Sequence, residues 1–150
     1  MTDSQTSPND LVAVLTEIGI INQLSTTAFE RLLPDDMRLS HFTLLHHLAR
    51  LDGKWSPARL ANALQVTKGA ITNTMQRMEA KGYVLVEPAP DDGRGKLVSL
   101  TSAGLARRNE ALMMAAPALF PIAAQITPDE IAAALPFLIK LRTVFDKARD

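Results

Sequence analysis

Apolar residues recur at the spacing of an α-helix along most of the chain. Between about residues 9 and 33 they stand at Leu11, Val14, Leu15, Ile18, Ile21, Leu24 and Phe29, which predicts a long first helix. Pro34-Asp35-Asp36 is expected to end this helix. Ser40 is then expected to cap a second helix, which carries Phe42 and leucines on one face and stops at Asp52-Gly53.

Two short helices joined by a tight link are predicted next. Ser56-Pro57 combines a capping residue with proline at the first helical position. Gln65-Val66 forms the link, and Thr67 caps the following helix, which ends at Lys81-Gly82 with glycine just past the last turn. Residues 83–88 and 96–101 are rich in β-formers and enclose the turn-rich segment 89–95. This part of the chain therefore predicts a β-hairpin.

Two helices complete the chain. Thr101 or Ser102 caps a long one, which Pro117 and Pro121 are expected to kink or interrupt. The capping box Thr127-Pro128-Asp129-Glu130 opens the last helix, which Pro136 is expected to bend. A pair of short helices followed directly by a glycine-tipped hairpin is typical of a winged helix-turn-helix. The predicted fold is mainly α with a small β-hairpin wing.

The composition is that of a folded protein of one domain. The 150 residues are 47% hydrophobic and 21% charged, and none is cysteine. The lack of cysteine excludes a disulfide framework, a thiolate metal site and a thiol redox switch. The first ten residues show neither region of an export signal, and the longest apolar stretch, residues 111–124, is too short to cross a bilayer. We therefore expect a soluble, cytoplasmic protein with no cofactor and no membrane partner.

The charges are balanced overall but unevenly distributed. Sixteen basic and sixteen acidic residues give a formal net charge of zero. Residues 54–108, however, hold nine basic residues and four acidic ones. This distribution predicts a local surface that attracts anions, within a chain that is not generally basic.

The helix between Thr67 and Lys81 has one face suited to reading DNA. Ile71, Met75 and Met78 are spaced to point inward. The opposite face carries Lys68, Gly69, Thr72, Asn73 and Gln76, with Arg77 at its flank. Asn and Gln can read adenine edges, Thr can contact a thymine methyl group or a phosphate, and glycine allows close approach of the backbone. A merely solvated helix face would more often carry Glu/Lys pairs one turn apart.

The tip of the predicted hairpin has a second feature of this kind. Arg94 stands between Gly93 and Gly95, with Asp92 before them and Lys96 after them. An arginine on a flexible loop tip suits insertion into a narrow minor groove, and Asp92 could orient its guanidinium. Alone, the segment would be explained better by turn chemistry around a solvated arginine. Its place directly after a recognition-type helix favours the DNA interpretation.

These residues carry a family resemblance. The segments FTLLHHLARLDGKWSPARLANALQVTKGAITNTMQRMEAKGYVLV and DDGRGKLVSLTSAG are similar to the MarR family of bacterial transcriptional regulators, whose D-x-R-x-K wing matches Asp92, Arg94 and Lys96. The resemblance extends over essentially the whole chain. It implies a DNA-binding lobe at about residues 37–101, dimerisation helices at about 9–33 and 102–148, and a short first strand near Trp55. It also implies a homodimeric repressor, or less often an activator, on a pseudo-palindromic operator.

Dimerisation also has support from the residues themselves. The first and last helices carry more apolar surface than one small core can absorb. Two-fold symmetry would place the two helices 67–81 in successive major grooves, about 34–36 Å apart. The candidate DNA-binding residues are Lys54, Ser56, Thr67, Lys68, Gly69, Thr72, Asn73, Gln76, Arg77, Asp92, Arg94 and Lys96. Of these, Lys54, Lys68, Arg77 and Lys96 are expected to contact phosphate; Thr72, Asn73 and Gln76 to read bases; and Arg94 to enter the minor groove.

The resemblance further implies a small anionic aromatic or lipophilic ligand. Its candidate lining is Met37, His41, Phe42, His46 and Trp55. Zinc sensing is disfavoured, because His41 and His46 do not share a helix face well and no carboxylate stands at ligand spacing. The three histidines could also be phosphate contacts or partly buried core groups, and Met113 and Met114 are interpreted as core residues.

Two other functions are weighed against DNA binding. A winged-helix protein-interaction module without a DNA role predicts an apolar or acidic face on helix 67–81, where the sequence has Lys68, Asn73, Gln76 and Arg77. An enzyme predicts a catalytic motif, and the sequence shows no Ser/His/Asp motif, phosphate loop or paired-carboxylate spacing. The adjacent aspartates at 35–36 and 91–92 stand in turns, which fits turn chemistry. The sequence therefore predicts a non-enzymatic regulator.

Overall fold

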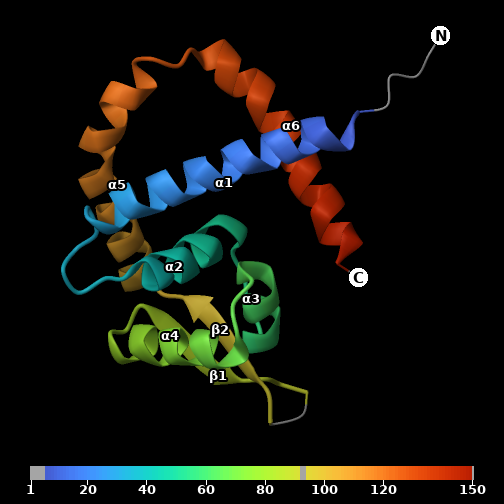
Figure 1. Ribbon diagram of the computed structural model, residues 1–150. Coiled ribbons are helices and arrows are strands. Elements are labelled where there is room, and N and C mark those ends of the chain that lie inside the picture. The colour runs from blue at the N-terminus through green and yellow to red at the C-terminus, as the bar shows by residue number, and fades with distance from the viewer. Residues whose placement is uncertain (1–5, 92–93, 150) are drawn as a thin grey trace. The chain divides into compact units, whose positions relative to one another are not determined.

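The helices and strands follow one another in the order expected from the sequence. The computed structural model describes residues 6–91 and 94–149. Its elements are α1 (Pro8–Glu30), α2 (Leu39–Leu51), α3 (Pro57–Leu64), α4 (Lys68–Ala80), β1 (Val84–Pro88), β2 (Lys96–Leu100), α5 (Ser102–Ala123) and α6 (Pro128–Ala148) (Figure 1). The chain divides into two compact units, Met1–Met114 and Ala115–Asp150, and α5 runs from the first into the second.

Most helices begin at the capping residues that the sequence predicts. The hydroxyl oxygens of Ser56 and Thr67 accept hydrogen bonds from backbone N–H groups three residues on, at 3.3 and 3.1 Å. Thr101, rather than Ser102, caps α5, because its hydroxyl accepts from the Gly104 N–H at 3.0 Å. Thr127 and Glu130 form the predicted capping box of α6. Each bond satisfies a donor that the first turn of a helix would otherwise leave unpaired.

The start of α2 differs from the prediction. Ser40 lies inside the first turn, and the residue flanking the helix is Arg38, whose backbone is extended. The Nδ1 atom of His41 accepts a hydrogen bond from the backbone N–H of Arg38 at 3.2 Å. The histidine ring thus satisfies the N–H of the residue that precedes the helix, and the helix starts at Leu39.

The prolines of the last two helices do not interrupt them. α5 continues through Pro117 and Pro121, and α6 continues through Pro136. A proline removes one N–H and leaves the carbonyl one turn earlier without its usual partner. All three prolines are exposed, so water can reach that part of the backbone. Of the two outcomes expected for α5, the interruption is therefore wrong, while the kink at Pro117 and Pro121 and the bend at Pro136 stay predictions.

The hairpin is an antiparallel pair of strands with an isolated β-bridge beside it. β1 pairs with β2 in a register that sets Val84 opposite Leu100 and Pro88 opposite Lys96. Trp55 exchanges two backbone hydrogen bonds with Val98, at 2.9 and 2.8 Å. The small strand predicted near Trp55 is thus reduced to a single bridge residue, which ties the segment before α3 to the wing.

The hydrophobic core of the first unit lies among α2, α3, α4 and the hairpin (Figure 1). Its largest fully buried side chains are Leu44, Leu45, Leu48, Leu60, Ile71, Met78 and Val98. The end of α1 joins this core, since the Phe29 ring meets the Phe42 ring edge-on at 4.6 Å between centroids. The core holds the helix-turn-helix and the wing as one packed body.

Much apolar surface remains exposed elsewhere. α1 and α6 have no buried residue, and the side chains of Ile21, Leu24, Phe120 and Phe145 are between 48% and 69% exposed. By length and composition alone, α1 is apolar enough to cross a membrane, and α5 with α6 meet that criterion only as a bent pair. A soluble helix that packs against protein meets the same criterion. Apolar faces of this size are expected to be buried against another surface.

Candidate nucleic-acid interface

α3 and α4 form a tight helix-turn-helix. Between them, Gln65 adopts a left-handed backbone conformation with a φ of 54°, and its N–H bonds back to the end of α3. Thr67 then restarts the helix by capping α4. At the far end of α4, Gly82 takes a φ of 75° and turns the chain into β1. The predicted link and stop are therefore both present.

The inner face of α4 is buried, as its spacing predicts. Ile71, Met75 and Met78 are 2%, 5% and 1% exposed. Thr74 is also buried on this side, which the sequence reasoning missed because it counted only apolar residues. Burial of this face fixes which side chains of α4 point away from the core.

The outer face of α4 carries every residue expected there. Lys68, Gly69, Thr72, Asn73, Gln76 and Arg77 are all exposed. The Thr72 hydroxyl donates to the Lys68 carbonyl at 2.8 Å, and the Arg77 Nε donates to Asn73 Oδ1 at 3.2 Å. The Asn73 amide nitrogen, which can only donate, therefore has no role in that contact. Hydrogen-bonding groups thus cover an exposed helix face between two cations.

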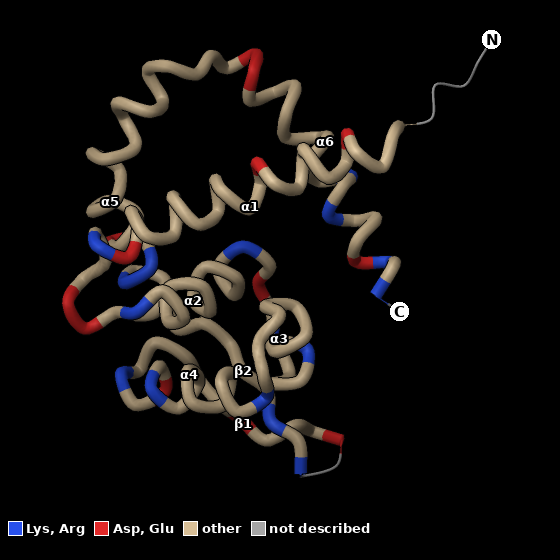
Figure 2. Tube along the Cα trace, in the orientation of Figure 1, with Lys and Arg blue, Asp and Glu red and all other residues tan. Residues whose placement is uncertain are grey.

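The hairpin brings its basic residues to a neighbouring surface. Arg94 and Lys96 are exposed at the tip and at the start of β2. Asp92, expected to orient Arg94, lies outside the described residues, as does Gly93. Figure 2 shows Lys and Arg on α3, α4 and the hairpin, and also on α2, α5 and α6, whereas α1 has none. The helix-turn-helix and the wing thus present cations on the same surface as the exposed polar face of α4.

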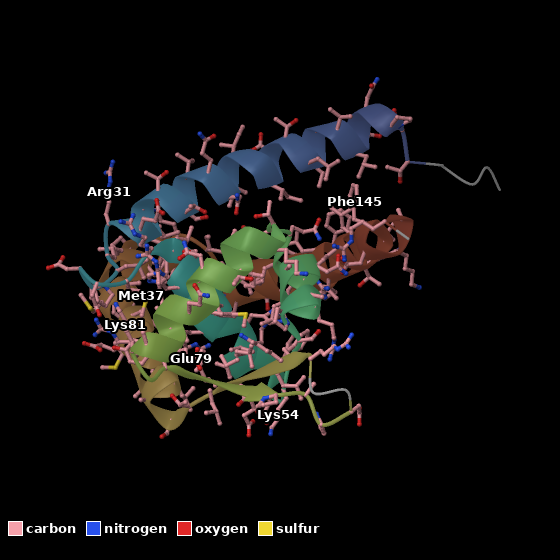
Figure 3. The ribbon with its side chains drawn as sticks, turned by 90° about the horizontal axis from the view of Figure 1, so that it is seen from below. Arg31, Met37, Lys54, Glu79, Lys81 and Phe145 are labelled. Carbon is pink, nitrogen blue, oxygen red and sulfur yellow. The ribbon has the colours of Figure 1, made fainter. Side chains whose placement is uncertain are left out.

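The base of the wing contains contacts that the sequence did not reveal. The Lys54 Nζ forms an ion pair with Glu87 Oε2 of β1 at 2.7 Å, beside the hairpin (Figure 3). The Arg59 guanidinium lies 4.3 Å from the centre of the Trp55 ring, a cation–π arrangement. The spacing of Trp55 and Arg59 across a helix start was the one sequence feature that could have indicated the cation–π contact. Both contacts hold cations next to the wing.

The comparisons with known proteins agree with this geometry. The MarR family model matches residues 35–95. The multiple antibiotic resistance protein MarR of Escherichia coli is 31% identical over 134 residues, covering 88% of this chain and 92% of that protein. A variant of E. coli MarR complexed with operator DNA has a TM-score of 0.69 at 28% identity, covering 91% of this chain and 99% of that one. BpsR of Bordetella bronchiseptica, 23% identical with a TM-score of 0.69, covers 87% of this chain and 98% of its own and shares the fold.

The chain belongs to the MarR family. It is thus a MarR-family transcriptional regulator with the mainly helical winged fold that the sequence predicts. The operator complex of the E. coli relative supports DNA binding as the activity of this fold.

The five residues expected to line a ligand site do not all meet in this MarR-family lobe. Met37 and His41 line an open groove of about 1100 Å³, together with Thr74, Arg77 and Lys81 of α4 and its end. Figure 3 shows Met37 and Lys81 at the same end of the lobe. The other three candidates lie elsewhere: Phe42 stacks on His46 at 5.3 Å, His46 contacts Arg108, and Trp55 packs against His47.

The three histidines are held in their neutral form. The pKa of each of His41, His46 and His47 is lowered, first by burial and then by nearby cations. Nδ1 of His46 accepts from Arg108 Nε at 3.2 Å and lies 3.1 Å from Nη2. A protonated ring could not accept from a guanidinium at that atom. The histidines are therefore built into the lobe as uncharged groups.

This arrangement predicts a loss of stability in mild acid. Below the ordinary histidine pKa of about 6.5 the unfolded chain binds protons before the folded chain does, so the free energy of unfolding falls as the pH drops from about 7.5 to about 5.5. His46→Gln keeps an acceptor for Arg108 and removes one titrating group. Thermal unfolding at both pH values should show a smaller drop for this variant. An equal drop in the variant and the wild type would exclude a contribution from His46.

Proposed function

We propose that this chain acts as a homodimer that binds a pseudo-palindromic operator and represses transcription. The observation that carries the proposal is the outer face of α4, where Thr72, Asn73 and Gln76 stand exposed above a buried apolar face. Such side chains match the donor and acceptor pattern of base edges in the major groove. Lys68 and Arg77 at the borders of that face supply charge for the phosphates.

Each candidate residue that the structure describes then has a role that its position permits. Lys54, Lys68, Arg77 and Lys96 contact phosphate, Arg94 enters the minor groove, and Gly69 allows close approach of the backbone. Ser56 and Thr67 use their oxygens as helix caps, which leaves each hydroxyl proton available to a phosphate. Asp92 orients Arg94. In the unbound protein Lys54 pairs with Glu87, so binding phosphate requires it to exchange that partner.

The dimer is supported by the uncovered apolar faces. Exposed Ile21 and Leu24 of α1, and Leu138 and Val144 of α6, would otherwise face water. We infer that about residues 9–33 and 102–148 serve as dimerisation helices and about 37–101 as the DNA-binding lobe. A second copy is a better cover for α1 than a bilayer, because Glu17 and the Asn-Gln pair at 22–23 interrupt its apolar surface. We also infer a cytoplasmic location from the proposed DNA-binding role.

A small effector is proposed to relieve binding. The DNA binding of the B. bronchiseptica relative BpsR is regulated by 6-hydroxynicotinic acid, a small aromatic acid. In this chain, the groove beside α4 combines Met37 and His41 with the cations Arg77 and Lys81. A ligand there would act on the same helix that reads the operator. Bound effector would fix the two lobes at a separation that no longer matches the groove spacing.

The experiment that tests the proposal is selection of sheared genomic DNA on the purified protein at about 150 mM salt, followed by sequencing of the retained fragments. An inverted repeat whose half-sites lie one helical turn apart is the expected result. Salt-sensitive retention of random fragments would contradict sequence-specific regulation. The selection is repeated on protein that has been unfolded and refolded to remove any effector bound in the groove. Retention of no DNA in both experiments would favour a protein partner instead.

Asn73→Ala tests base reading on the selected operator. The variant should lose about 1–3 kcal/mol of discrimination at one position in each half-site, because the amide is the group that reads the base there. Binding to a panel of single-base operator variants measures this loss. Asn109→Ala on α5 is the matched control and should keep wild-type discrimination. Equal weakening on every sequence would make Asn73 a backbone contact.

A further inference from the structure

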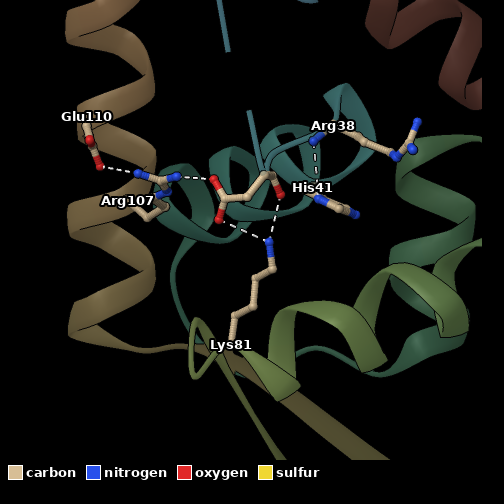
Figure 4. A network of polar contacts seen from close by, with 6 residues as sticks. Arg38, His41, Lys81, Arg107 and Glu110 are labelled. Atoms are coloured by element: carbon tan, nitrogen blue, oxygen red, sulfur yellow. Dashed lines mark hydrogen bonds and ion pairs between the residues drawn. The ribbon is translucent and has the colours of Figure 1, made fainter. Parts of the chain in front are cut away.

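One carboxylate in the first unit joins three segments that are far apart in the sequence. Asp36 lies in the turn between α1 and α2, and Figure 4 shows Lys81, Arg107 and Glu110 of the network that it joins. Its Oδ2 accepts from the Lys81 Nζ at 3.1 Å, and its backbone carbonyl accepts from the same Nζ at 2.7 Å. Its Oδ1 accepts from Nη2 of Arg107, whose Nη1 donates to Glu110 Oε2 at 2.6 Å. The cluster therefore connects the turn before α2 with the end of α4 and the second turn of α5.

The two cations mark the end of one helix and the start of another. Lys81 is the residue that ends α4, and Arg107 stands in the second turn of α5. The chain between them forms the hairpin, and at its base Thr101, the cap of α5, donates hydrogen bonds to the carbonyls of Gly82 and Tyr83 at 2.7 and 3.2 Å. Asp36 adds a second polar link between the recognition helix and α5, through Lys81 and Arg107.

The cluster has one largely buried member, since the side chains of Asp36 and Glu110 are 48% and 54% exposed. The Arg107 side chain is only 18% exposed, and within the described residues its buried Nε finds no partner. Hydrogen bonds from Lys81 and Arg107 lower the pKa of Asp36. The carboxylate thus stays ionised at neutral pH. Isolated exposed ion pairs add little to the free energy of unfolding. The main contribution of a link between three segments is therefore to hold them in a fixed orientation.

We propose that Asp36 is a positioning residue for DNA recognition: its carboxylate fixes the angle between α4 and the first turns of α5. In a dimer, that angle helps to set the separation of the two α4 helices and so the half-site spacing that binds best. This inference rests on the proposed function. The proposal gives Asp36 a role in DNA recognition, beyond the formation of the turn in which it lies.

The chain offers a closely matched pair of variants. Asp36→Asn removes the charge and keeps the backbone carbonyl that Lys81 also uses. Asp35→Asn makes the same chemical change at the adjacent exposed residue. Since the sequence has no cysteine, Gln76→Cys on α4 and Ala106→Cys on α5 can carry two spin labels without further changes. Dilution with unlabelled protein limits the measurement to one protomer.

The first readout is the distance distribution between the two labels, taken without DNA. Asp36→Asn should broaden or shift it, whereas Asp35→Asn should leave it as in the unsubstituted labelled protein. Arg107→Gln should reproduce the Asp36→Asn effect, and the double variant should add nothing. An unchanged distribution in Asp36→Asn would overturn the proposal, whatever the protein does with DNA.

The second readout compares operators whose half-site spacing is altered by one or two base pairs. The preference of the wild type for its selected spacing should fall by about fivefold or more in Asp36→Asn, while binding to a single half-site stays within about twofold. Equal losses on half-site and full operator, with a lower melting temperature, would indicate a merely structural role and overturn the proposal. A wild type that prefers no operator would instead refute the proposed function, and the label distances would still decide the role of Asp36.

Discussion

Replacing Gly104 by alanine should lower the free energy of unfolding by about 2–3 kcal/mol. Gly104 is buried in the first turn of α5, where that helix crosses the residue before β1. A Cβ there would overlap the Tyr83 carbonyl oxygen and would lie 2.8 Å from Leu100 Cδ1 and 2.9 Å from the Tyr83 carbonyl carbon. The Tyr83 carbonyl accepts a hydrogen bond from the Thr101 N–H at 3.2 Å, so it cannot move aside without losing that bond.

Urea unfolding at fixed protein concentration measures the effect, since the stability of a dimer depends on concentration. Gly69→Ala is the matched control. It lies in the first turn of α4 with nothing within 4 Å of the added Cβ, so alanine should leave stability unchanged or raise it by up to about 1 kcal/mol. Similar destabilisation in both variants would show that close packing at Gly104 is not the cause.

Local chemistry explains why so much of the lobe could be predicted. Caps such as Thr67 and stops such as Gly82 depend on neighbours within four residues. The inward face of α4 follows from helical periodicity alone. The winged fold and the exposed face with Asn73 and Gln76 were therefore visible in the sequence, and family membership supports the fold independently.

Features that depend on distant contacts could not be predicted. Asp36 and Arg107 are separated by 71 residues, and no local pattern links them. The proposed ligand lining failed to converge for the same reason: Phe42 and His46 turn toward α1 and α5, away from the groove that Met37 and His41 line. At α2, a histidine ring satisfies the N–H of the residue that precedes the helix, where the sequence predicts a serine cap. These parts of the candidate site could therefore be identified only from the three-dimensional structure.

Arg94→Ala should weaken operator binding by about tenfold or more at about 150 mM salt and should flatten its salt dependence. If each wing places one guanidinium in the minor groove, the slope of log K against log salt should fall in magnitude by about one per wing. The cause is electrostatic: a narrow minor groove has the most negative potential, and each cation bound there releases counterions. Fluorescence anisotropy on the selected operator at several salt concentrations measures affinity and slope together.

Two further arginine variants separate the wing from general charge. Arg31→Ala removes a cation from the end of α1, away from the hairpin (Figure 3), and should change the slope little. Arg94→Lys keeps the charge but is more strongly hydrated than arginine, so it should restore most of the slope and only part of the affinity. Unchanged affinity and slope in Arg94→Ala would mean that the wing does not contact DNA. Full recovery of affinity in Arg94→Lys would instead place Arg94 on an open phosphate that needs only a point charge, because a narrow minor groove favours the less hydrated guanidinium.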